Sequence, residues 1–414
     1  MYPKIIVSYA ERYKPPEFLI DEEIKNMELF SSDIVGVAQA KAANCGLAIE
    51  SFVLAEDGDK FKNFIDELEK AVGQAPTLII VLALVNGIKD WATIGSYLNM
   101  LRLAERHCDR ALQANQDSGL SPAEIIFNAL NDFGRNNILE KYDEDDITSN
   151  LLPNYLDRLI NFFSSSPENR TDSQGQCRSL SLFFYVVASD LGVKDIDFYL
   201  IETVDEDGIP WGHATTLHNN ELFESTSVDP SSSGLWERAY LKIRVSPYAC
   251  LLNDSAQKIL VLTEEIIADK TNEEISDAAL ANQFHNLLQQ LKVTENILAF
   301  NYNEQPWYTY FMLAKGYKEI ANLRPDGEER INDCEKVINY SLKYLQTFID
   351  CDNILPEPAI TQLLKSNIIG NLYDFYVFWR DQTGKSNKEV EQVIDKIRYK
   401  IETSLEYWRT AKPE

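Results

Sequence analysis

A helical pattern followed closely by a β-hairpin pattern stands near the middle of this chain and constrains its fold. Between Cys177 and Gly192 the apolar residues fall at helical spacing, and the glycine ends the pattern. Two short runs with β-branched and aromatic residues, 213–218 and 221–226, then flank the pair 219–220. That pair is Asn-Asn, which tolerates the left-handed conformations of a two-residue turn. The order predicts an α+β core with a small antiparallel sheet.

Cys177 is a candidate nucleophile because we expect it in the first turn of this helix. Unpaired backbone N–H groups and the positive end of the helix dipole favour a thiolate there. Gly175 allows the chain to enter the turn tightly. The alternative is a buried, inert cysteine, which is the common state of this residue inside cells.

The hairpin supplies an imidazole and a carboxylate. If His218 pairs with Glu221, then Thr215 lies opposite Glu224. Residues two apart on a strand share a face, and so do directly opposed residues, so His213 and Glu224 project to one side. We therefore expect Glu224 to accept a hydrogen bond from the His213 ring and to orient it.

Two rivals exist for these roles. Asp229 is the alternative acid, but the same register extended places it on the other face from His213. His218 is the alternative base, but it precedes the turn directly, so we expect a solvated residue at the hairpin tip.

At these residues the chain resembles the transglutaminase-like superfamily, whose core is related to the papain-type cysteine proteases. The similarity extends over about residues 154–230, and the bacterial branch that joins this core to tetratricopeptide-like helices is the most similar. Two departures point to an altered cleft or to lost activity: Thr215 stands where many members have an aromatic residue, and the hairpin is short. The matching motifs are Gly175-Gln176-Cys177, Asp190-Leu191-Gly192, Gly212-His213 and Glu224-Ser225-Thr226.

The chemistry expected of such a core is acyl transfer. Cys177 would attack an amide or peptide carbonyl, His213 would protonate the leaving amine, and Glu224 would fix the ring tautomer. The Cys177 backbone N–H is one candidate oxyanion donor, and Gln174 or Gln176 is a candidate for another. Water as acceptor gives a protease or amidase, and an amine gives a transamidase. The competing hypothesis is a non-catalytic scaffold that binds a protein partner.

The amino-acid composition limits the classes of partner and cofactor that the chain is expected to bind. The chain has 414 residues and a net charge of −26, which argues against nucleic acid or an anionic membrane surface and permits a cationic partner. Six scattered cysteines without a C-x-x-C pair predict neither a disulfide framework nor a zinc ribbon, and with four histidines we expect no metal site and no cofactor. No segment has the pattern of a signal peptide or membrane span, so a cytoplasmic protein is expected. The sequence leaves the oligomeric state open.

Three regions are predicted. Residues 1–150 form an N-terminal helical region, with a buried helix at 77–85 and a capping box at Ser121. Residues 151–262 form the transglutaminase-like core. Residues 263–414 form a C-terminal helical region, in which aromatic residues between 298 and 348 suggest paired helices. If these helices stack as repeats, they offer a concave surface to a protein or peptide.

Overall fold

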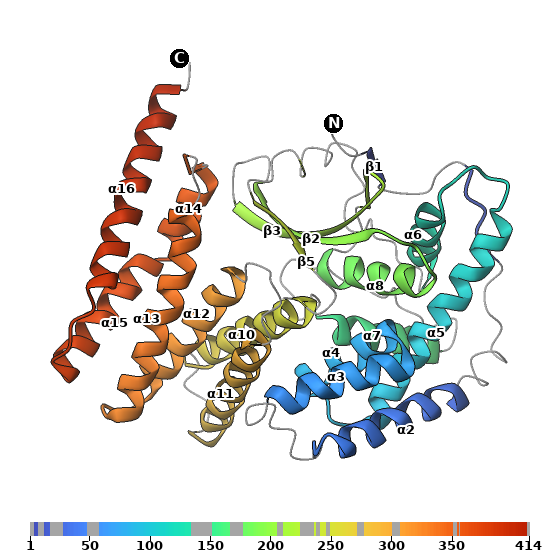
Figure 1. Ribbon diagram of the computed structural model, residues 1–414, viewed down its shortest axis with the longest axis horizontal. Helices are drawn as coiled ribbons and strands as arrows, with labels where there is room; N and C mark the ends of the chain where they lie inside the picture. The colour runs from blue at the N-terminus through green and yellow to red at the C-terminus, as the bar shows by residue number, and fades with distance from the viewer. Residues whose placement is uncertain are drawn as a thin grey trace.

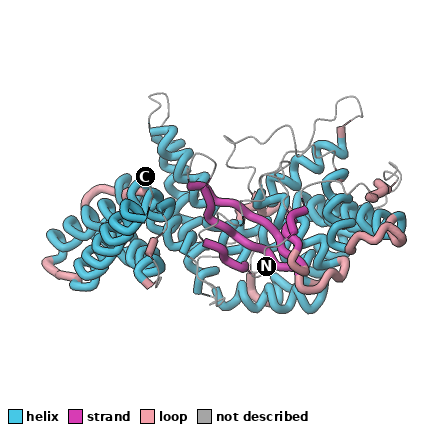
Figure 2. The backbone as a smooth tube through the Cα atoms, turned by 90° about the horizontal axis from the view of Figure 1, so that it is seen from above, coloured by secondary structure: helices cyan, strands magenta, loops and turns pink. Residues whose placement is uncertain are grey.

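A computed structural model gives the three-dimensional structure of the chain (Figure 1). It describes residues 4–6, 12–16, 28–47, 58–133, 151–165, 177–204, 210–223, 236, 241–245, 249–270, 277–299, 307–350, 354–355 and 357–411. Within them the fold is α+β: two groups of helices lie on either side of one small sheet (Figure 2).

The first group of helices precedes the sheet in sequence. It comprises α2 (Glu28–Asn44), α3 (Gly58–Val72), α4 (Gln74–Val85), α5 (Trp91–Ala114), α6 (Pro122–Asp132), α7 (Leu152–Ser164) and α8 (Cys177–Asp190). Two predictions are confirmed here. Residues 75–85 of α4 are all buried, and the Ser121 capping box forms, with the Glu124 N–H donating to Ser121 Oγ at 3.2 Å.

The sheet contains five described strands in the order β1-β4-β3-β2-β5. Their bounds are β1 (Lys4–Ile6), β2 (Ile196–Val204), β3 (Pro210–His218), β4 (Glu221–Phe223) and β5 (Leu241–Val245). Strands β2 to β5 pair antiparallel, as predicted, whereas β1 pairs parallel with β4. The sequence analysis expected residues 1–150 to be all helical; the strand at residues 4–6 corrects this, because three residues carry no helical or strand periodicity.

Helix α8 packs against one face of the sheet, directly beneath it in Figure 1. Aromatic rings make this contact: Phe223 of β4 lies 5.1 Å from Phe184 of α8 and 5.3 Å from Phe127 of α6, between ring centroids. One continuous buried cluster joins α8 and this sheet face to helices α2 to α7. The N-terminal helices and the sheet therefore share one core.

The second group of helices follows the sheet. It comprises α10 (Ala249–Lys270), α11 (Asp277–Ala299), α12 (Trp307–Leu323), α13 (Glu328–Ile349), α14 (Glu357–Lys365), α15 (Ile368–Thr383) and α16 (Lys388–Ala411). Helix α10 packs on α11 and α12, α12 on α13, and α13 on α15 and α16. A second buried cluster lies between them. Residue 262, where the sequence analysis ends the core, lies inside α10, whose first turns belong to the first cluster and whose remainder belongs to the second.

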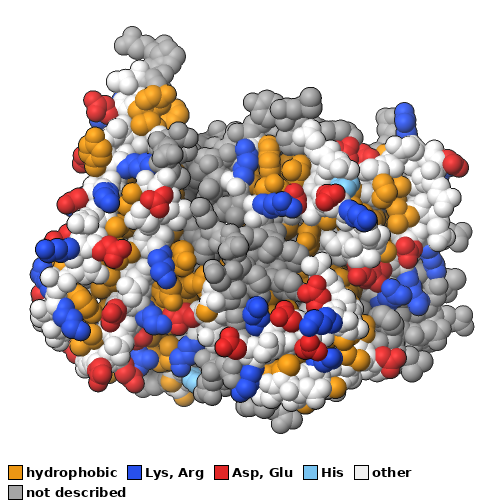
Figure 3. Space-filling model, in the orientation of Figure 1, with side chains coloured by type: hydrophobic (Ala, Val, Ile, Leu, Met, Phe, Trp, Pro, Cys, Tyr) orange, Lys and Arg blue, Asp and Glu red, His pale blue; other side chains and the backbone are white. Residues whose placement is uncertain are grey.

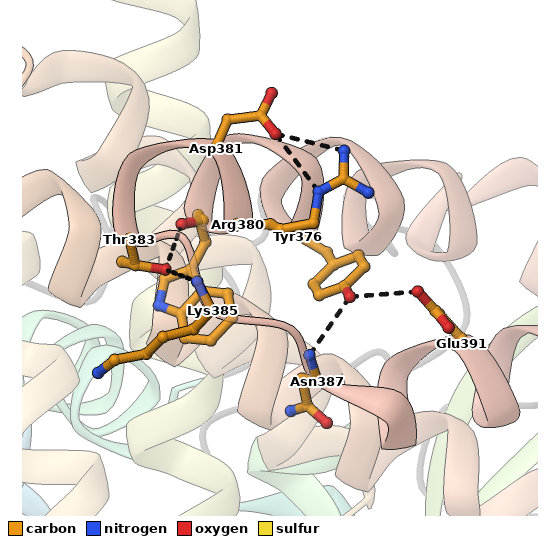
Figure 4. A network of polar contacts seen from close by, with 8 residues as sticks. Tyr376, Arg380, Asp381, Thr383, Lys385, Asn387 and Glu391 are labelled. Carbon is orange, nitrogen blue, oxygen red and sulfur yellow. Dashed lines mark hydrogen bonds and ion pairs between the residues drawn. The ribbon is translucent and has the colours of Figure 1, made fainter.

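Polar contacts join the last two helices of this group, α15 and α16, at the turn between them (Figure 4). The Tyr376 hydroxyl donates to Glu391 of α16 at 3.3 Å and accepts from the Asn387 backbone N–H at 3.3 Å. Gly384 ends α15 with φ of 66°, a left-handed conformation that glycine adopts without strain. The turn thus holds α15 and α16 side by side.

Candidate functional site

Cys177 is the first residue of α8, as predicted, and is buried, with 6% of its surface exposed. It belongs to the first buried cluster. Among the described residues, no hydrogen bond or ion pair involves its thiol. The position favours an anion, but the surroundings of the side chain in the described part of the chain are apolar.

The β3–β4 hairpin has the predicted register. His218 pairs with Glu221, Leu217 with Leu222, and Thr216 with Phe223. Asn219 and Asn220 have φ of 48° and 65°, the left-handed pair that a tight hairpin turn requires. The local geometry that sequence reasoning used is therefore confirmed as far as residue 223.

The register assigns β3 side chains to faces. Phe223 contacts α8, so Thr216, its direct partner, and Ala214, two residues earlier, lie on the α8 face. His213 alternates with Ala214 and projects to the opposite face. That face also carries Tyr199, which pairs with Thr215.

The face that carries His213 is covered by other elements. The Trp236 ring lies 5.2 Å from that of Tyr199, and Lys242 of β5 places its ammonium 5.0 Å from the Trp236 ring centroid. Helix α14 contacts β3. His213 is 4% exposed and Thr215 fully buried, so this face is packed as well.

A polar bond joins helix α8 to β3. The Ser181 hydroxyl donates to the Ala214 carbonyl at 3.1 Å. Cys177 lies one turn before Ser181 on the same helix face, so it too faces the sheet. Cys177 therefore faces the sheet from α8, whereas His213 projects from β3 to the opposite face of the sheet.

Several predicted site residues lie outside the described residues: Glu224, the rival acid Asp229 and the oxyanion candidates Gln174 and Gln176. Their roles stay predictions. Within the described part of the hairpin, the Thr215 hydroxyl donates to the Phe223 carbonyl at 3.0 Å, which ties β3 to the last described residue of β4.

His218 differs from its prediction. It is buried, with 8% of its surface exposed, rather than solvated at a hairpin tip, and its Nε2 lies 2.9 Å from Asn219 Nδ2. The reason is that it lies on the α8 face of β3, together with Thr216, where the core covers it.

Sequence reasoning missed a buried charge cluster at the start of α8. Arg178 follows Cys177, and its Nη2 lies 3.5 Å from Oδ1 of Asp254 in α10. Asn86, which caps α4, donates its side-chain amide to the other carboxylate oxygen of Asp254. Burial raises the pKa of Asp254, while Arg178 and the Asn86 hydrogen bond oppose that rise. In the sequence, Arg178 and Asp254 are visible only as two opposite charges, each inside a helical pattern, and nothing there indicates that they meet.

A separate cleft of about 330 Å³ lies between α2 and α5. Ser31 and Ser32 line one wall, and Trp91 and Asn99 line the other. None of the lining residues is charged. Within the described residues, no cluster of three or more His, Cys, Asp and Glu side chains could hold a metal ion, and no helix has the length and hydropathy to cross a membrane.

Comparison with known proteins adds no relative. No family model matches the chain, no curated protein matches it, and no solved structure matches it. The assignment of function therefore depends on the geometry of this chain alone.

Proposed function

We propose that this protein is a non-catalytic scaffold with a transglutaminase-like core, whose C-terminal helices bind a protein partner. The observation that carries the proposal is the relation of Cys177 to His213. A thiol nucleophile needs its base within hydrogen-bond reach. Here Cys177 faces the sheet from α8, His213 projects from the other sheet face, and both are buried.

Exposed apolar side chains support the binding role of the C-terminal helices. Among the described residues, six large hydrophobic side chains have more than a third of their surface exposed. Four of the six lie on α14, α15 and α16. Aromatic residues are enriched in protein interfaces, so exposed tyrosines on these helices are available to contact a partner. The four are Leu364 at 58%, Tyr373 at 50%, Tyr399 at 71% and Tyr407 at 49%.

Charge favours a basic partner. The net charge of −26 raises the rate of encounter with a cationic protein and repels an acidic one. On the face shown in Figure 3, acidic and basic side chains are interspersed and do not gather in one patch.

A second candidate function is acyl transfer by Cys177, His213 and Glu224. Two observations favour it: Cys177 begins α8, where the first backbone N–H groups of a helix lack intrahelical partners, and the hairpin has the predicted register up to Phe223. It requires a rearrangement that brings the imidazole to the α8 face of β3.

Thiol labelling of the native protein decides between the two functions. We expect iodoacetamide at pH 6 to modify Cys177 more slowly than Cys45, because Cys177 is buried and Cys45 only half-buried, so the reagent reaches Cys177 less easily. His213→Ala should leave the Cys177 rate unchanged. A Cys177 rate above that of Cys45 that drops in His213→Ala, or in Glu224→Gln, would replace the scaffold proposal with the enzyme.

A further inference from the structure

The ion pair between Arg178 and Asp254 joins the two groups of helices at the start of α8. The Arg178 side chain is 8% exposed and that of Asp254 is fully buried. Three elements converge there, because Asn86 at the end of α4 also binds Asp254. Lys258, one turn further along α10, adds a second positive charge near the carboxylate.

Asp254 is continuous with a buried polar network inside the C-terminal helices. The next residue, Ser255, places its hydroxyl 2.6 Å from that of Thr294 in α11, and Gln290 donates to Ser255 Oγ at 2.8 Å. Both hydroxyl-bearing residues are fully buried. A shift of α10 would therefore disturb Arg178 and α11 together.

Among the described residues, some buried polar atoms of this cluster have no hydrogen-bond partner. Arg178 Nη2, Asp254 Oδ1 and Asn86 Oδ1 are buried without a hydrogen bond, and the two charges meet at 3.5 Å rather than in a bidentate contact. Such a pair stabilises a particular arrangement only while both partners stay in place, since either charge left alone in the interior is costly. The Arg178–Asp254 pair is therefore suited to fixing the position of α8 relative to α10.

We propose that the Arg178–Asp254 pair is a positioning contact through which α10 holds the first turn of α8, and with it Cys177, in its buried place. The accessibility of Cys177 then depends on the state of the C-terminal helices. By thermodynamic linkage, a ligand that displaces α10 exposes the thiol. The inference does not depend on whether Cys177 is catalytic, since the thiol serves as a reporter of local opening.

Three buried free cysteines allow local opening at three places to be compared within the same protein molecule. Cys177 reports the start of α8, Cys108 the core of the N-terminal helices, and Cys334 the core of the C-terminal helices. The full-length protein is labelled with iodoacetamide at pH 8, and the rate at each cysteine is followed by mass spectrometry of its peptide. In Asp254→Asn, which keeps the shape but removes the charge, we expect the Cys177 rate to rise at least about tenfold. The rates at Cys108 and Cys334 should stay within about twofold.

Two matched variants complete the design. The double variant Arg178→Met with Asp254→Leu replaces both charges by apolar groups and should return Cys177 to near its original protection. Asp333→Asn breaks the Arg324–Asp333 pair, with a distance of 2.5 Å, beside Cys334; it should raise the Cys334 rate and leave Cys177 unchanged. If Asp254→Asn does not fold, Arg178→Lys, which loses the forked guanidinium, gives the same comparison at smaller amplitude.

A Cys177 rate that changes less than about twofold in the single variants would overturn the proposal. So would an equal rise at Cys108, because the pair would then stabilise the whole fold without positioning α8. These results are distinct from those of the pH 6 experiment, which compares Cys177 with Cys45 and substitutes His213 or Glu224 rather than Arg178 or Asp254.

Discussion

The buried carboxyl group of Glu105 in α5 lies close to the carboxyl group of Asp190, the last residue of α8. Glu105 is 3% exposed, and Arg102 also donates to it at 2.8 Å. Burial raises the pKa of Glu105 to about 8, and the neighbouring Asp190 adds to the rise, while Arg102 opposes it. At neutral pH Glu105 therefore favours its protonated form.

Stability should fall as pH rises. A carboxyl with a folded pKa of about 8 and an ordinary unfolded value binds more protons when folded, so the free energy of unfolding decreases between about pH 4.5 and pH 8. The slope from this group approaches ~1.4 kcal/mol per pH unit. Urea unfolding at pH 5, 6, 7 and 8 measures it. Glu105→Gln should flatten the curve, and the half-exposed Glu264→Gln should not; an unchanged slope in Glu105→Gln would assign the proton elsewhere.

Gly316 of α12 should not tolerate a side chain. A Cβ there would lie 2.7 Å from Leu291 Cδ2 and 2.9 Å from Ile259 Cγ2, which are on α11 and α10. We expect Gly316→Ala to lower the free energy of unfolding by about 1–3 kcal/mol through overpacking. Gly36→Ala in α2, where a Cβ meets nothing within 4 Å, is the control and should raise stability by about 0.5–1 kcal/mol. Thermal unfolding of the two variants gives the comparison, and a stabilised Gly316→Ala would show that the three helices lie further apart.

The β3–β4 turn should select residues by backbone conformation. Asn220 has φ of 65°, so Asn220→Gly should keep or raise stability, whereas Asn220→Val should cost about 1–2 kcal/mol. Chemical denaturation of the two variants measures the difference. Equal stability of glycine and valine at this position would mean that the hairpin has another turn and another register.

The exposed aromatic residues of the last helices should contact the partner. A photoreactive phenylalanine analogue at Tyr399, which is 71% exposed, should crosslink to one dominant protein in cell extract, and preferably to a basic one. The same analogue at Lys62 of α3 is the control. Addition of the Tyr373→Ser change should reduce the yield. Equal products from both crosslinking positions would remove the assignment of binding to α14, α15 and α16.

The hairpin could be predicted because its determinants are local. The register follows from two asparagines and from alternation within a few residues, so one turn assignment gave the pairing of His218 with Glu221. Alternation also gave the residues that share a face with His213. Alternation along the strand could not show which face of the sheet α8 covers. That face is set by the contacts of Phe223 with Phe184 and Phe127, which come from distant segments.

Contacts between distant segments account for the rest of what was missed. Nothing near Arg178 in the sequence indicates Asp254, and a buried carboxylate in a helix has the same local pattern as an exposed one. His218 was expected in solvent because the turn was considered alone, without the core that covers its face. The start of α8 at Cys177, in contrast, was predicted from glycine and apolar spacing within one segment.

Strand β1 gives the sheet an unusual order of assembly during synthesis. Lys4 pairs with Glu221 of β4, so β1 has no partner in this sheet until synthesis has passed residue 221. Helices α2 to α8 can form and pack in that interval, since their contacts are closer in sequence. The edge of β4 that faces away from β3 is paired only when β1 lies against it. Closure of this edge therefore joins two segments that are synthesised far apart in time.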